Sequence, residues 1–136
     1  MDYSSELRPS TAELVALYDS VGWSVYTEDP DGLARGVANS TFVVTARDES
    51  GRLVGLARVL SDDMSIVYVQ DVLVDPAHQR NGVGCELLQR CLDRFAHVRQ
   101  RMLLTDDEPH QHRLYKGLGF HDVSRLDGVG LHAFVD

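Results

Sequence analysis

The chain has 136 residues, of which 43% are hydrophobic and 25% are charged, a composition that is typical of a folded domain and excludes a disordered segment. Its formal net charge of −8 disfavours general binding to nucleic acid or to an anionic membrane, and it weakly favours a cationic substrate. Residues 1–136 are enough to bury a hydrophobic core without disulfides or metals, so we expect a single domain.

The N-terminus and the cysteines indicate the compartment. The first residues carry no basic segment followed by an apolar run, and the chain has no long apolar stretch of about eighteen residues. Cys85 and Cys91 lie six residues apart in a predicted helix and do not share a helical face. We therefore expect free thiols in a cytoplasmic protein.

The N-terminal third predicts two helices joined by an aromatic segment. Residues 8–11 open the first helix and Gly22 ends it. A loop with Trp23 and Tyr26 follows, and residues 32–39 form a weaker candidate helix. The apolar residues that recur at helical spacing in the first helix are Leu14, Leu17, Tyr18 and Val21.

Three strands follow and are expected to form a meander. Segments rich in β-branched and apolar residues lie at 41–46, 53–60 and 66–74, and turns at 48–51 and 62–63 separate them.

The rest of the chain predicts further helices and strands. Residues 85–95 show the spacing of an amphipathic helix and residues 102–105 form a short apolar strand, which predicts a strand-helix-strand crossover. A helix over 109–116 and two closing antiparallel strands at 120–124 and 131–135 complete the pattern.

The run Gln79–Gly84, between the third strand and the amphipathic helix, is the most informative local feature. Gly82 and Gly84 allow a tight entry into the helix and remove β-carbons that would keep an anion from the backbone. Because the first turn of a helix carries unpaired N–H groups and partial positive charge, the run predicts a phosphate site. No Gly-Lys-Ser/Thr triplet follows, which excludes a Walker loop, and Leu87 stands where a Rossmann fingerprint has its third glycine.

The order of elements, together with two motifs, resembles the GNAT N-acetyltransferase superfamily. Gln79-x-x-Gly82-x-Gly84 matches that family's acetyl-CoA pyrophosphate signature, and Tyr115–Phe120 matches its motif of Tyr, three residues and Gly-Phe. The resemblance covers nearly the whole chain. It implies an α/β fold with a mixed central sheet of about six to seven strands, a splayed cleft and about four flanking helices. It also implies acetyl-CoA as the donor substrate.

In that family the strand before the glycine loop carries a bulge that frees backbone groups for the pantetheine arm and the acetyl carbonyl. The resemblance places the bulge at Val72, Leu73 and Val74, and Leu73 or an immediate neighbour would donate the N–H that stabilises the oxyanion. Arg80 would reach the 3′-phosphate, or is a solvated loop charge. The residues implied for the pyrophosphate site are Gln79, Arg80, Asn81, Gly82, Val83 and Gly84.

The resemblance carries the general acid over to Tyr115, whose hydroxyl would neutralise the leaving CoA thiolate. A core role for its ring is the alternative. Many family members have Asn seven residues before this Tyr and Ala four residues before it, whereas this chain has Glu108 and Gln111. The contact of that Asn with pantetheine is therefore not carried over.

The attacking amine must lose a proton, and Asp71 is the first candidate for the base. Strand alternation places Asp71 on the opposite face from Tyr68 and Gln70. The alternatives are a structural, hydrogen-bonded Asp71, with Tyr68 or a water chain taking the proton. Trp23 and Tyr26 lie in the segment between the first two helices, which commonly borders the site of the acceptor substrate in this family. They are therefore candidates for an aromatic wall of that site, or for the hydrophobic core.

The histidines near the acidic residues 106–108 are candidates for a metal site. His110 and His112 are two residues apart, which separates them on a helix, and His121 lies further along the chain. We expect no metal.

We therefore expect an acyltransferase that moves acetyl from acetyl-CoA to a primary amine of a small molecule, by direct transfer in a ternary complex. Residues 71–76 with Gln79 also resemble the small arylalkylamine (serotonin-type) branch, which suggests an aromatic or aliphatic amine. The alternatives are an acetyltransferase of protein N-termini or lysines, and a non-catalytic module that binds or senses acyl-CoA. Nucleic acid and membrane are not expected partners, and a homodimer through the closing strands stays open.

Overall fold

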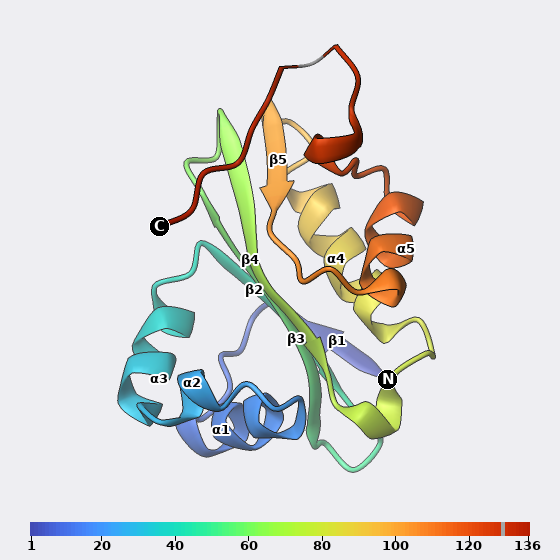
Figure 1. Ribbon diagram of the computed structural model, residues 1–136. Coiled ribbons are helices and arrows are strands. Elements are labelled where there is room, and N and C mark those ends of the chain that lie inside the picture. Colours follow the sequence, from blue (N-terminus) through green and yellow to red (C-terminus); the bar gives the residue numbers. More distant parts are fainter. Residues whose placement is uncertain (129) are drawn as a thin grey trace. The chain divides into compact units, whose positions relative to one another are not determined.

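The computed structural model describes residues 1–128 and 130–136 (Figure 1). The chain forms two compact units, Met1–Leu104 and Thr105–Asp136. In the described residues, the first unit holds a five-stranded sheet with α-helices α1 to α4, and the second holds α-helix α5 and a short 3₁₀ helix.

The sheet is mixed and has the strand order β1-β2-β3-β4-β5. Each of β1 to β3 pairs antiparallel with the next strand, and β5 pairs parallel with β4 after the crossover helix α4. The expected meander and crossover are confirmed. The strands are β1 (Asp2–Ser4), β2 (Phe42–Arg47), β3 (Leu53–Ser61), β4 (Ile66–Val74) and β5 (Gln100–Leu103).

Helices of the first unit cover both faces of the sheet (Figure 1). α4 packs closely on one face, because a Cβ at Gly55 would lie 3.0 Å from Leu87 Cδ1 and 3.2 Å from Val83 Cγ1. The next residue of β3, Leu56, points the other way into a buried cluster with α1 and α3. The helices are α1 (Thr11–Ser20), α2 (Ser24–Thr27), α3 (Pro30–Ala38) and α4 (Val83–Arg94).

Local side chains determine where the first helices begin. Ser10 and Glu13 form a capping box, in which each side chain accepts the backbone N–H of the other residue. Asp29 caps α3 by accepting the N–H of Gly32 at 3.0 Å, and Pro30 occupies the first turn. The segment expected to be a loop between α1 and α3 contains the one-turn helix α2.

The two closing strands are the main error of the sequence prediction. The 3₁₀ helix Val123–Arg125 overlaps the first predicted strand, and the described residues of 126–136 carry no strand. Asp122 accepts hydrogen bonds from the backbone N–H and hydroxyl of Ser124, at 3.0 and 2.7 Å, which favours a local turn over strand pairing. The sheet therefore has five strands in the described chain, including β1, which no pattern predicted.

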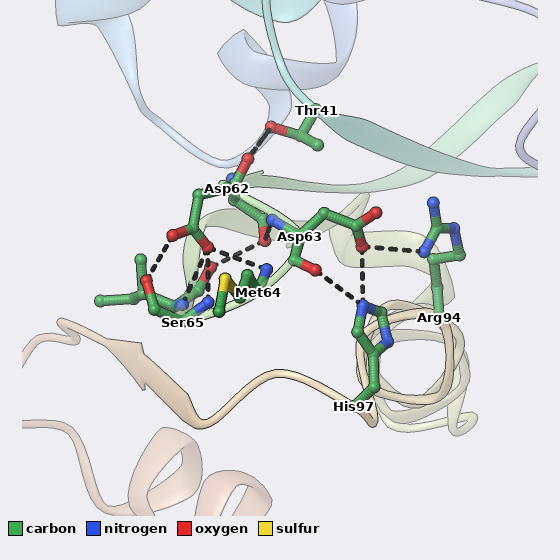
Figure 2. A network of polar contacts seen from close by, with 9 residues as sticks. Thr41, Asp62, Asp63, Met64, Ser65, Arg94 and His97 are labelled. Atoms are coloured by element: carbon green, nitrogen blue, oxygen red, sulfur yellow. Dashed lines mark hydrogen bonds and ion pairs between the residues drawn. The ribbon is translucent and has the colours of Figure 1, made fainter.

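The turn between β3 and β4 is tied to the end of α4 (Figure 2). Asp62 Oδ1 accepts three backbone N–H groups of the turn at 2.8 to 3.1 Å. Asp63 Oδ1 lies 2.8 Å from His97 Nε2 and 3.4 Å from Arg94 Nη1. The hairpin and the segment after α4 thereby support each other at the opposite end of α4 from the glycine loop.

The charge of Glu13 in the capping box is expected to stabilise the fold. Hydrogen bonds from the Arg47 guanidinium and then from Ser10 lower the pKa of Glu13 from 4.5 to about 2. Because the folded-state pKa is the lower one, this stabilisation is present above pH 4.5 and is lost as the pH falls toward 2. We expect Glu13→Gln to lower Tm at pH 7 by roughly 2 to 4 °C. Thermal unfolding followed by circular dichroism at pH 7 and pH 3 measures it.

The matched control is Glu49→Gln in the exposed turn between β2 and β3. An equal drop in Tm for both variants at pH 7, or a drop for Glu13→Gln that is the same at pH 3, would contradict the assignment.

Candidate functional site

Only the first part of β4 is paired with β5. β5 pairs with residues Ile66–Val69, and its last residue, Leu103, is opposite Val69. Residues Gln70–Val74 continue beyond the end of β5 while they stay close to β3. We call this side of Gln70–Val74 the open edge of β4.

The bulge lies at Gln70, where the open edge begins. Asp71 is paired with Arg58 and Val69 with Val59, so β4 has one residue more than β3 at this point. The family resemblance implies a bulge at Val72–Val74, which is two residues too late. An inserted residue resets the alternation of side chains, which no periodicity in the sequence reveals.

The phase of the β3–β4 ladder decides which N–H groups are directed at the open edge. Hydrogen-bonded and non-hydrogen-bonded pairs alternate in an antiparallel ladder. Asp75 N donates to Val54 O at 2.8 Å, so Leu73, two residues earlier, also bonds to β3. The N–H groups of Val72 and Val74 are therefore directed at the open edge, whereas that of Leu73, the residue predicted as the donor, is directed at β3.

The glycine loop continues directly from this strand. Gln79 Nε2 donates to Val74 O at 2.9 Å, which anchors the loop to the end of β4. Arg80 and Gly82 both have left-handed φ angles, 64° and 78°, and α4 begins at Val83. The first-turn N–H groups of α4 stand at the run predicted to bind pyrophosphate. Arg80 and Asn81 are exposed beside them.

Asp71 is buried and carries an ion pair. Only 3% of its surface is exposed, and Arg58, which is 7% exposed, donates from Nε to Asp71 Oδ2 at 2.5 Å. Tyr18 donates to the same oxygen at 2.8 Å, and Tyr26 donates to Oδ1 at 3.1 Å. Burial, and then the Asp71 charge, raise the pKa of Tyr18 and of Tyr26, so both hydroxyls stay protonated donors.

This network favours the structural alternative for Asp71 over the base. Its oxygens are already occupied by one guanidinium and two hydroxyls, and Arg58 also donates to Gly36 O at 3.3 Å and to Ser40 Oγ at 3.2 Å. One buried guanidinium thus links the bulge to the end of α3. Sequence reasoning missed Arg58, although an arginine in the middle of an apolar strand was the signal that could have found it.

Tyr26 lies beside the bulge and contacts two consecutive residues of β4. Its hydroxyl donates to Asp71 and accepts from Gln70 Nε2 at 3.2 Å. Alternation predicted opposite faces for Gln70 and Asp71, and the bulge explains why both reach the same hydroxyl. Trp23 and Tyr18 pack around the Tyr26 ring at centroid distances of 6.1 and 5.1 Å. Trp23 and Tyr26, which were predicted to border the substrate that accepts the acetyl group, therefore lie together and are partly buried against the core.

Tyr115 belongs to the second unit, on α5 (Pro109–Gly117). Its ring packs edge-to-face on Phe120 at 6.2 Å, and Phe120 N donates to Tyr115 O at 3.0 Å. Burial raises the pKa of the Tyr115 hydroxyl, with Thr105 acting in the opposite direction. The Gly-Phe part of the motif thus shapes the end of this helix.

The two departures from the family motif have local roles. Glu108 caps α5 by accepting the N–H groups of His110 and Gln111, both at 3.0 Å. Gln111 accepts a hydrogen bond from Thr105. Across residues 1–128 and 130–136, no group of three or more His, Cys, Asp or Glu side chains is arranged to hold a metal ion.

The two thiols differ in their exposure to solvent. Cys85 is exposed and Cys91 is buried, and both are free, as the sequence predicted. Among the described residues, none of the helices combines the length and the apolar character needed to span a bilayer.

Comparison with known proteins identifies a family. The model of the acetyltransferase (GNAT) family matches residues 8–120. An acetyltransferase-like protein from Gibberella zeae is 36% identical over 84 residues, which cover 60% of this chain and 46% of that protein. The histone acetyltransferase TAP1 of Glycine max is 30% identical over 130 residues, 86% of this chain and 54% of that protein. The chain spans about half the length of these two relatives.

Solved structures share the fold. A GNAT family acetyltransferase from Streptococcus pneumoniae TIGR4 superposes with a TM-score of 0.81 at 28% identity, covering 98% of this chain and 97% of that one. An aminoglycoside 6′-N-acetyltransferase complexed with coenzyme A superposes with a TM-score of 0.65 at 20% identity, covering 81% of this chain and 64% of that one.

The two glycines of the loop are expected to respond differently to alanine. Gly82 has a φ of 78°, which costs alanine about 1 kcal/mol or more. A Cβ at Gly84 would make an ordinary contact 3.6 Å from Val74 Cγ2, and alanine is a better helix former than glycine. We expect Gly82→Ala to lower the free energy of unfolding by about 1 kcal/mol, and Gly84→Ala to leave it unchanged or raise it. Urea denaturation of the two variants compares them directly, and equal losses would show that the loop conformation differs from the one described.

Proposed function

The chain belongs to the acetyltransferase (GNAT) family, and from that premise we propose that it transfers an acetyl group from acetyl-CoA to a primary amine of a small molecule, in a ternary complex. The observation that carries the proposal is the continuity of the open edge of β4 with the glycine loop. Backbone N–H groups of Val72 and Val74 are directed at that edge, and the start of α4 follows within the same segment.

This segment suits the parts of acetyl-CoA in order. The N–H groups of the glycine loop and the first turn of α4 would bind the pyrophosphate, with the exposed Arg80 near the 3′-phosphate. Val74 would pair with the pantetheine arm as a neighbouring strand does. The Val72 N–H would then donate to the acetyl carbonyl oxygen.

The chemistry is an acyl transfer. The amine nitrogen attacks the carbonyl carbon of the thioester, and the electron pair of the C=O bond moves to oxygen, where the Val72 N–H stabilises the charge. When the C–O double bond re-forms, the C–S bond breaks. Tyr115 would give its proton to the leaving thiolate, and the raised pKa of its hydroxyl keeps that proton in place at neutral pH.

We assign the amine proton to water, with Tyr68 as the alternative acceptor, and not directly to Asp71. Arg58, Tyr18 and Tyr26 already donate to the Asp71 carboxylate. In this proposal Asp71 acts by orienting Tyr26.

The acceptor would lie against Tyr26 and Trp23. Because the Tyr26 hydroxyl gives its proton to Asp71, its oxygen can only accept further hydrogen bonds, which suits an amine that carries N–H donors. The aromatic rings suit an aromatic or aliphatic amine, the substrate class of the arylalkylamine branch.

Two alternative functions are each supported by one observation. Similarity to a histone acetyltransferase over 86% of this chain favours a protein lysine or N-terminus as acceptor. Occupation of Asp71 by three donors is compatible with a module that binds acyl-CoA without turnover.

A thiol-release assay with acetyl-CoA tests the function. The panel contains arylalkylamines, polyamines, amino acids, aminoglycosides and peptides with free lysines or N-termini. We expect release with at least one small amine and none with peptides. Release with peptides alone would support the first alternative, and binding of acetyl-CoA with no release across the panel would support the second.

Tyr115→Phe tests the general acid. The substitution keeps the ring that packs on Phe120 and removes the hydroxyl, so we expect kcat to fall by about 100-fold or more while acetyl-CoA affinity stays near normal. Steady-state kinetics and calorimetric binding of acetyl-CoA separate the two quantities. Tyr3→Phe on β1 is the matched control, and an unchanged kcat in Tyr115→Phe would remove Tyr115 from the mechanism.

A further inference from the structure

His78 is a partly buried histidine that the proposed mechanism does not use. It is the last residue of the 3₁₀ helix Pro76–His78, directly before Gln79 of the glycine loop. Its Nδ1 atom is buried and has no hydrogen-bond partner among the described residues. Buried polar atoms in proteins are nearly always hydrogen-bonded, so this one requires a reason.

Two carboxylates face the two ring nitrogens. Asp75 Oδ1 lies 3.7 Å from His78 Nδ1, and Asp48 Oδ2 lies 3.9 Å from Nε2. A neutral imidazole has one nitrogen without hydrogen, whose lone pair would face a carboxylate. The imidazolium carries N–H on both nitrogens, so it complements both partners.

The carboxylates are held by separate elements. Asp48, in the turn between β2 and β3, accepts the N–H groups of Ser50 and Arg52 at Oδ1, at 2.9 and 3.1 Å, and its other oxygen faces the ring. Asp75, at the end of β4, is 5% exposed and accepts the N–H of Ala77 at 2.9 Å. The ring therefore stands between a fixed turn and the start of the glycine loop.

The other charges near the ring do not replace this role. Arg52, the first residue after the turn, donates to Asp75 Oδ2 at 2.5 Å and so neutralises part of that carboxylate. Arg80 follows His78 by two residues and is exposed. Asp48 and Asp75 are the groups within ion-pair distance of the ring nitrogens.

We propose that His78 is a positioning residue that, when protonated, latches the start of the glycine loop onto the β2–β3 turn and thereby strengthens the binding of acetyl-CoA. The inference rests on the proposed function in one respect, that the loop binds the CoA pyrophosphate. A latched loop has less conformational freedom to lose on binding. Because only the doubly protonated ring faces both carboxylates with N–H groups, the contribution requires that form and is expected to be larger at low pH than at high pH.

The experiment measures the affinity for 3′-dephospho-CoA between pH 5.5 and pH 8 by calorimetry. This ligand lacks the phosphate monoester of CoA, which itself titrates at a pKa of about 6. We expect affinity to fall by about three- to tenfold from low to high pH in the natural chain. His78→Phe keeps a flat ring without nitrogens and should bind at all pH values as the natural chain does at pH 8.

Asp48→Asn keeps the turn acceptor and removes the charge, so it should reduce the pH dependence without unfolding the loop. The matched control is His97→Phe, which removes a histidine that contacts an aspartate at the other end of α4 (Figure 2) and should keep the full pH dependence. The same pH dependence in the natural chain and in His78→Phe would overturn the proposal.

A second measurement is independent of CoA. Nitrogen-15 NMR of the His78 ring, and hydrogen exchange of the amides of residues 79–84, are followed over the same pH range. We expect both ring nitrogens to be protonated at low pH and the loop amides to be better protected there than at pH 8. A ring with one unprotonated nitrogen at pH 5.5, or protection that does not change, would overturn the latch even if no CoA derivative binds. Absence of binding with an intact latch would instead refute the proposed function.

Discussion

The buried ion pair between Arg58 and Asp71 holds together the part of the sheet from which the site is built. It joins β3 to the first residue after the bulge in β4, and through Gly36 and Ser40 it also holds the end of α3. Removing one member of a buried pair leaves an uncompensated charge and costs about 3–5 kcal/mol. The pair lies directly beside the bulge, where β4 leaves its first register with β3 and the open edge of β4 begins.

One extra residue in β4 decides which of its backbone N–H groups are directed at the open edge. β4 continues past the end of β5, and because it has an extra residue at Gln70, its Val72 and Val74 N–H groups are directed away from β3. The same insertion turns Gln70 and Asp71 toward one hydroxyl, that of Tyr26. The backbone groups proposed to bind acetyl-CoA and the side chains proposed to border the acceptor are therefore produced by one irregularity.

The glycine loop is anchored at its beginning by side chains rather than by a regular ladder. Asp75 caps the 3₁₀ helix, and Gln79 bonds back to Val74 O. His78 lies between these two residues and faces carboxylates on both sides. Loops that bind phosphate through backbone N–H groups need a fixed geometry, and these contacts supply it on the strand side while α4 supplies it on the other.

Much of the architecture could be predicted because its signals are local. Helical spacing at Leu14, Leu17 and Tyr18, the apolar run of β4 and the glycines before α4 each report the conformation of a short segment. The closing strands were wrong because Asp122 and Ser124 bond locally, and β1 was missed because three residues carry no periodicity.

The sequence by itself determined the family, the order of the central elements and the loop proposed as the donor site, since spacing and glycine content are enough for those. The tertiary structure decided which backbone N–H is directed at the open edge and what Asp71 contacts. Both depend on strand register and on partners 13 and 53 residues away, Arg58 and Tyr18, and a register shift leaves no trace in the local pattern of a strand.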